Sequence, residues 1–198
     1  MKYIFPLAFV LAMMLFSGGA FAEEKVAFKA ECKGKSEWDR EARTFELNEG
    51  VKLTYGDMVL TCEWLLVFMD ESNRRPLSLS AKGYGKGANS EEVAKGRLEF
   101  RWGDYALRCR QVDAELSPEG SMPTKVTAKD DVWAKLAGGY TVHCARLEIE
   151  PSADGESAKA RLASDKYVKR CRIAGENFVA TESSGVVIYD KGKYLHTG

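Results

Sequence analysis

The sequence repeats one hairpin-sized segment three times, and this repetition limits the fold more than any other feature. The copies read VKLTYGDMVLTCEWL at 51–65, LEFRWGDYALRCRQV at 98–112 and VWAKLAGGYTVHCARL at 132–147. Each copy has an alternating strand, a turn centred on glycine, a second alternating strand, and a cysteine six residues after that glycine. A decayed fourth copy has Gly175 in its turn and Thr181 at the cysteine position. Such repeats indicate one unit stacked on itself, which builds a long surface or groove rather than a compact catalytic pocket.

Apolar and polar residues alternate within each copy. In the first copy Val51, Leu53 and Tyr55 share one face, and Lys52 and Thr54 share the other. This period of two is typical of half-buried antiparallel strands. After each repeat cysteine the apolar positions shift by one residue. A shift at the same place in every copy predicts a β-bulge or a corner, where each strand bends around the edge of a sandwich.

The amino terminus has the pattern of a secretory signal peptide. Lys2 precedes an apolar run from Ile4 to Phe16, and Ala20-Phe21-Ala22 matches a small-residue cleavage site. The apolar run is too short for a membrane span. We therefore expect a signal peptide over residues 1–22, cleavage after Ala22, and a periplasmic location. The remaining 198 − 22 = 176 residues are enough for one β-domain with a single core, over 23–198.

Charge and motif content argue against nucleic-acid binding and against catalysis. The whole chain has 29 basic and 29 acidic side chains, and a nucleic-acid-binding protein would carry a basic excess. His143 precedes Cys144, so in a strand their side chains point to opposite faces, which disfavours a nucleophilic Cys–His pair. The sequence contains no nucleophile elbow, no phosphate-binding glycine loop and no Cys-x-x-Cys metal pair. We expect no enzymatic activity, no cofactor and no metal.

The cysteines allow two interpretations. Five remain after the expected cleavage, so at least one thiol is unpaired within a monomer. Cys62, Cys109 and Cys144 occupy equivalent positions in the repeat, and stacking brings such positions close together. A disulfide between neighbouring copies would form if the Cα atoms lie about 4.4–6.8 Å apart. Alternatively, each cysteine is a small buried apolar residue.

The first copy and its surroundings resemble the OstA-like domain family. The resemblance rests on Trp38-Asp39, Gly50-Val51, Gly56-Asp57 and a strand closing with Asp70, and the tail GVVIYDKGKYLHTG at 185–198 repeats the closing pattern. That family includes the lipopolysaccharide-transport proteins LptA and LptC and the N-terminal domain of LptD. The resemblance implies a folded-over antiparallel β-jelly roll, whose apolar groove holds lipopolysaccharide acyl chains and whose domains join end to end. This chain has cysteine followed by Glu, Arg or Ala where the family usually has Ala-Asp.

The leading functional hypothesis is therefore a periplasmic lipid-binding and transfer protein that holds acyl chains without covalent chemistry. The residues expected to line its groove are Leu53, Tyr55, Leu60, Phe100, Trp102, Leu107, Leu136 and Val142. The same residues would fill the core of any β-sandwich. Basic side chains near the hairpins either meet lipid phosphates or lie on a solvated strand face; these are Lys52, Arg101, Arg108 and Arg110.

The alternative hypothesis is a structural or protein-interaction module of the cell envelope. A jelly roll that does not close leaves unpaired strand edges, which another chain can extend. Residues 26–32 and 185–195 lie near the two ends of the stack and are the candidate edges. The expected partners are lipopolysaccharide or a similar glycolipid, other OstA-like envelope proteins, and further copies of this chain.

Overall fold

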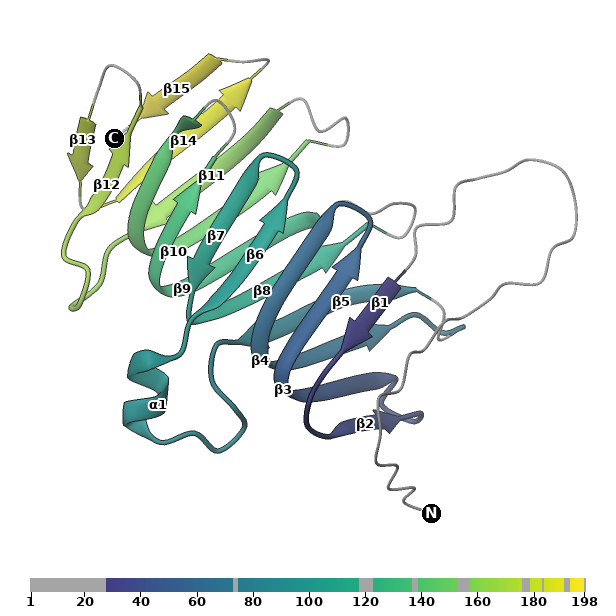
Figure 1. Cartoon of the computed structure of the whole chain (residues 1–198). Coiled ribbons are helices and arrows are strands. Elements are labelled where there is room, and N and C mark those ends of the chain that lie inside the picture. Colours follow the sequence, from purple (N-terminus) through teal and green to yellow (C-terminus); the bar gives the residue numbers. More distant parts are fainter. Residues whose placement is uncertain are drawn as a thin grey trace, which may run out of the picture.

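The repeat copies form β-hairpins stacked side by side in a computed structural model of the chain (Figure 1). The structure describes residues 28–72, 75–117, 123–136, 139–152, 157–175, 179–182, 184–190 and 193–197. The expected signal peptide at 1–22 and Gly138 of the third turn lie outside the described residues. Gly56 and Gly103 occupy the first two turns with φ values of 55° and 52°, a left-handed conformation that glycine adopts without steric cost.

The two strands of each repeat copy pair antiparallel, and those of the first and third copies are long. The first copy spans β3 (Thr44–Tyr55) and β4 (Met58–Met69). The second spans β6 (Leu98–Trp102) and β7 (Tyr105–Cys109), and continues into β8 (Gln111–Leu116). The third lies on β9 (Pro123–Lys135) and β10 (Thr141–Pro151), and the decayed copy forms β12 (Cys171–Ala174) and β13 (Val179–Glu182).

The sheet folds over into two layers that share the long strands. The hairpin layer contains β1 (Phe28–Glu31), β6, β7, β12, β13 and the segments 51–55, 58–62, 132–135 and 141–144. The return layer contains β2 (Ser36–Asp39), β5 (Pro76–Lys82), β8, β11 (Ser157–Ala163), β14 (Ser184–Asp190), β15 (Lys193–Thr197) and the segments 44–48, 64–69, 123–129 and 146–151. Strand β4 illustrates the sharing, because residues 58–61 pair with β6 and residues 64–69 pair with β5.

In β4 and β10 the register shifts directly after the repeat cysteine, at the place that the change of parity predicted. The register of β3 against β4 shifts between Asn48 and Val51, where Glu49 and Gly50 have φ values of 67° and 58°. In β10 the register against β9 shifts between Cys144 and Arg146. These bulges form a corner, called here the cysteine corner, along which the sheet folds over. The expected all-β, folded-over antiparallel β-jelly roll is therefore confirmed.

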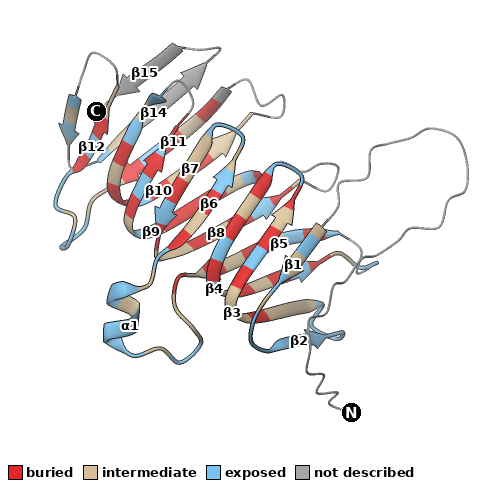
Figure 2. Ribbon diagram, viewed as in Figure 1, coloured by how far each residue is buried: buried red, intermediate tan, exposed pale blue. Residues whose placement is uncertain are grey.

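The hydrophobic core fills the space between the two layers. Buried residues alternate with exposed ones along the strands, and the stripes of buried residues in Figure 2 run across neighbouring strands. One cluster of apolar side chains connects the layers. Its largest fully buried members include Leu47, Leu53, Met58, Leu60, Leu65, Leu98 and Leu147.

A short helix, α1 (Ser90–Lys95), interrupts the connection between β5 and β6. The Asn89 side chain accepts a hydrogen bond from the Glu92 backbone N–H at 3.0 Å, and the Glu92 carboxylate accepts one from the Asn89 N–H at 2.9 Å. This capping box explains why a turn of helix begins there. No helix in the described part of the chain is both long and apolar enough to cross a membrane.

The two ends of the connection between β5 and β6 meet at Gly83 and Gly96, whose backbones are in close contact. A Cβ atom on Gly96 would lie 2.2 Å from the Gly83 carbonyl oxygen, whereas one on Gly85 would meet nothing within 4 Å. We therefore expect Gly96→Ala to lower the free energy of unfolding by about 1–3 kcal/mol, because backbone atoms must move apart. Gly85→Ala is the matched control and should change it by less than about 1 kcal/mol. Urea unfolding measures both, and equal effects would contradict the close contact.

Candidate functional site: the apolar interior and its free side

In the described part of the chain, backbone connects the two layers along one side only. Among the described residues, the chain crosses from one layer to the other at the cysteine corner, through bent strands or through connections such as 83–97 and 164–170. The opposite side, called here the free side, holds the turns at 56–57 and 103–104 (Figure 1). In the described part of this side, only side chains, and no backbone connection, cover the space between the layers.

All eight side chains expected to line a groove lie between the layers. Seven are buried, and Trp102 is partly buried and packs against the core. The buried ones are Leu53, Tyr55, Leu60, Phe100, Leu107, Leu136 and Val142. In this conformation they fill the core, so their contact with a lipid stays a prediction.

A small pocket of about 10 Å³, roughly the room that one water molecule needs, lies between the layers on the free side. One wall of the pocket consists of four residues that were expected to line a groove: Phe100, Trp102, Leu107 and Leu136. Four further residues, not assigned to a groove from sequence, complete most of its wall: Tyr105, Ala134, Val126 and Ile149. Among the described lining residues, Lys135 is the one with a charged side chain. The pocket is thus apolar; Lys135 itself is exposed, at an outward position between the buried Ala134 and Leu136.

Aromatic side chains border the free side and form an aromatic lip, defined as Phe28, Tyr55, Trp102, Tyr105 and Tyr140. The Trp102 and Tyr105 rings stack with centroids 5.0 Å apart, and Phe28 meets Tyr55 edge-on at 6.3 Å. Phe28, Trp102, Tyr105 and Tyr140 are only partly buried against the core. Tyr105 and Tyr140 each follow a hairpin turn at an inward position of the period-two pattern. The sequence alone could therefore have assigned them to the aromatic lip.

The repeat cysteines line the cysteine corner as buried thiols. Burial raises the pKa of both Cys62 and Cys109 to about 12, and it also raises the pKa of Cys144. Thiols that stay protonated at neutral pH are poor nucleophiles. The strand register does not make these three cysteines neighbours, because Leu98 lies between Cys62 and Cys109 and Val132 lies between Cys109 and Cys144.

The four basic residues considered for lipid phosphates are not gathered around the pocket. Arg101 and Arg108 point outward from the hairpin layer and pair with Glu99 at 3.7 and 2.9 Å. Lys52 is exposed on β3, and Arg110 lies at the cysteine corner between β7 and β8. The positions of Lys52, Arg101 and Arg108 agree with the interpretation of a solvated outer face, whereas Arg110 is partly buried.

His143 takes part in a polar cluster on the outside of the cysteine corner. Its Nε2 lies 3.0 Å from a carboxylate oxygen of Asp131, its ring stacks on Trp133 with centroids 3.9 Å apart, and Arg97 also pairs with Asp131. Burial of the Asp131 carboxyl opposes its ionisation, but the His143 hydrogen bond and the Arg97 charge outweigh burial and lower its pKa. Within the described residues, no group of three or more His, Cys, Asp or Glu side chains is arranged to hold a metal ion.

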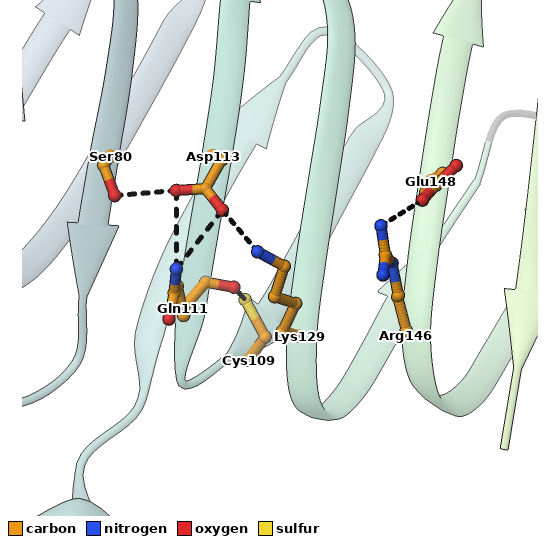
Figure 3. A network of polar contacts seen from close by, with 7 residues as sticks. All are labelled: Ser80, Cys109, Gln111, Asp113, Lys129, Arg146 and Glu148. Carbon is orange, nitrogen blue, oxygen red and sulfur yellow. Dashed lines mark hydrogen bonds and ion pairs between the residues drawn. The ribbon is translucent and has the colours of Figure 1, made fainter. Parts of the chain in front are cut away.

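A second polar network stabilises the outer face of the return layer (Figure 3). The Asp113 carboxylate accepts hydrogen bonds from Ser80 Oγ at 2.7 Å, Lys129 Nζ at 2.8 Å and Gln111 Nε2 at 3.2 Å. Burial of Asp113 opposes its ionisation, but the bonds from Lys129 and Ser80 prevail and lower its pKa below the ordinary 3.8. The network connects β5, β8 and β9 across the face opposite the core.

The lowered pKa of Asp113 predicts a pH-dependent contribution to stability. The contribution is present above the unfolded pKa and is lost as the pH falls through the folded value. We expect Asp113→Asn to lower the free energy of unfolding at pH 7 by up to about 1 kcal/mol, since the pair is partly solvated. The difference from the wild type should shrink below about pH 4. Urea unfolding from pH 7 to pH 3 measures it; a constant difference would contradict the assignment, and exposed Asp104→Asn serves as the control.

Comparison with known proteins gives a structural neighbour and no sequence match. No family model matches the chain, and no curated protein matches its sequence. Among solved structures, the fold is similar to LptH, the LptA-homologous periplasmic component of the lipopolysaccharide transport device of Pseudomonas aeruginosa. The match covers 78% of this chain and 93% of that one, with 10% identity and a TM-score of 0.47. At this identity the likeness concerns the path of the backbone and not individual side chains.

Proposed function

We propose that the chain is a periplasmic lipid-binding and transfer module, which holds acyl chains between its two layers without a covalent step. The observation that carries the proposal is the apolar pocket on the free side, where side chains alone close the described part of the sandwich. Four of its lining residues are ones that the repeat pattern had assigned to a groove: Phe100, Trp102, Leu107 and Leu136.

Lipid entry would begin at the aromatic lip. Each CH₂ group removed from water contributes about 0.8 kcal/mol. The pocket is too small for a whole acyl chain, so the layers must separate along the free side while the cysteine corner stays joined. Trp102 and Tyr105 are partly exposed and are therefore the first side chains an entering chain would displace. Opening would uncover apolar core side chains, and the acyl chain would then pack against them in place of the opposite layer.

The polar part of the lipid would remain outside the sandwich. Lys135 is exposed on the outer face of β9 next to the pocket lining, and its positive charge suits a phosphate, as in lipopolysaccharide or a similar glycolipid. Transfer would be passive, and the energy for directional movement would come from a partner protein. Cleavage of a signal peptide after Ala22 and export to the periplasm are part of the same proposal.

A second candidate function, protein interaction through strand edges, is favoured by the two ends of the sheet. At one end β1 and β2 each pair only with β3, and at the other β13 pairs only with β12, and β15 only with β14, among the described strands. Trp38 on β2 is 41% exposed and adds apolar surface to the first end. Such edges can accept a strand from a second copy or from another envelope protein.

Native mass spectrometry with two forms of one glycolipid separates these candidates. We expect purified protein to bind lipopolysaccharide that keeps its acyl chains, and not the same molecule after deacylation. Equal binding of both forms would contradict burial of acyl chains, and so would binding of neither. If neither form binds, self-association of the protein that rises with its concentration would favour the interaction module.

A further inference from the structure

All five cysteines belong to one row of residues that runs across the hairpin layer at the cysteine corner. The register of β1 against β3, extended by one position, places Cys32 opposite Val51, and Val51 pairs with Cys62. The row continues in the order Cys62, Leu98, Cys109, Val132 and Cys144. An apolar residue thus separates each cysteine from the next, up to Cys144.

The last step of the row differs from the others. Strand β12 pairs with β10 so that Val142 faces Ile173 and His143 faces Arg172. The next position in this register sets Cys144 directly opposite Cys171, with no strand between them. Both side chains are buried, with exposed fractions of 0% and 1%.

Strand spacing decides which of these cysteines can bond. Residues directly opposite on antiparallel strands have Cα atoms about 4.5–5.5 Å apart, which lies inside the range of about 4.4–6.8 Å found for disulfides. Cysteines two strands apart are separated by about 9–10 Å and lie outside it. The pairs Cys62/Cys109 and Cys109/Cys144 are therefore too far apart, while Cys144 and Cys171 have a suitable separation.

We propose that Cys144 and Cys171 form a disulfide when the protein folds in an oxidising compartment, and that this bond fixes the β12–β13 hairpin to β10. Two thiols lose two protons and two electrons, one S–S bond forms, and the disulfide of an oxidised thiol–disulfide oxidoreductase is reduced to two thiols. Cys32, Cys62 and Cys109 keep their thiols, since five minus two leaves three.

The timing of bond formation follows from burial. Burial and the neighbouring Cys171 thiol raise the pKa of Cys144, so the folded protein holds almost no thiolate there. The bond should therefore close before β12 docks against β10, and should form rapidly on refolding but slowly in the native reduced protein. The hairpin it fixes is an end element, with Val179 of β13 59% exposed, and end elements of this kind open most easily.

Peptide mapping after refolding tests the pairing. Purified chain is refolded from denaturant with a mixture of reduced and oxidised glutathione, alkylated under denaturing, non-reducing conditions, and digested after glutamate. Trypsin is unsuitable because Cys109 and Cys171 both yield the dipeptide Cys-Arg. Cleavage after glutamate puts each of the five cysteines in a different peptide, with Cys144 in 120–148 and Cys171 in 157–176.

We expect peptides 120–148 and 157–176 to be linked, with a loss of two hydrogen masses, and three cysteines to be alkylated. Alkylation of all five cysteines, or a link through another cysteine, would overturn the proposal. Cys171→Ala should abolish the link and leave four alkylated thiols, whereas Cys62→Ala, from the same row, should keep it. The wild-type map decides the question even if a variant fails to fold, and it does not depend on lipid binding.

Discussion

Replacing Leu98 with alanine is expected to lower the free energy of unfolding by about 2–5 kcal/mol. Leu98 is fully buried and lies between Cys62 and Cys109 in the row along the cysteine corner. Bent strands join the two layers at this corner, which limits how far neighbouring strands can move into the space that the missing side chain leaves. Urea unfolding of the wild type and the variant measures the difference. The comparison requires that the free energy of unfolding depends equally on urea concentration in both proteins.

Leu77→Ala provides the matched control for this substitution. Leu77 lies on β5 with 40% of its surface exposed, so the same change in volume leaves no enclosed cavity. We expect it to cost less than about 1 kcal/mol. Similar losses for the two variants would mean that the cysteine corner is not the tightly packed joint described above.

Replacing Trp102 with glutamate is expected to weaken binding of an acylated glycolipid at least about tenfold, equivalent to roughly 1.4 kcal/mol. Trp102 stacks on Tyr105 at the pocket and is partly exposed. A carboxylate there would remove contact surface for two or more CH₂ groups and would place a charge where acyl chains must pass. A titration with lipopolysaccharide, followed by native mass spectrometry, measures the affinity.

Trp133→Glu is the control for this prediction. Trp133 lies on β9 in the same layer and is 47% exposed, but its ring stacks on His143 outside the sandwich. Its substitution should leave lipid affinity within about twofold of the wild type, a change below roughly 0.5 kcal/mol. Circular dichroism must show that both variants fold. Equal losses of affinity in the two variants would place the lipid on the outer face.

Local sequence pattern predicted the hairpins and the bends because both depend on residues close together in the chain. Alternation around Gly56 and Gly103 specifies a hairpin, and the change of parity after Cys62 and Cys144 specifies a bend. The same pattern could not reveal that Leu98 and Val132 separate the repeat cysteines. That separation depends on which strands pair across the long connections, a non-local property.

The candidate site was predictable only in part for a related reason. Inward positions such as Leu107 and Val142 follow from alternation, but alternation does not tell a packed core from a groove. The pocket draws Val126 and Ile149 from the return layer, and only the fold-over brings them opposite Trp102. The Asp131 cluster also requires the corner, since Arg97 and His143 meet there from distant parts of the chain.

Site-specific photo-crosslinking can show whether acyl chains enter between the layers from the free side. A benzoylphenylalanine at position 102 samples the pocket, and the same residue at position 133 samples the outer face of the same layer. With acylated lipopolysaccharide and light, we expect a lipid adduct at position 102 and little at position 133. Adducts at both positions alike, or at position 133 only, would contradict entry from the free side.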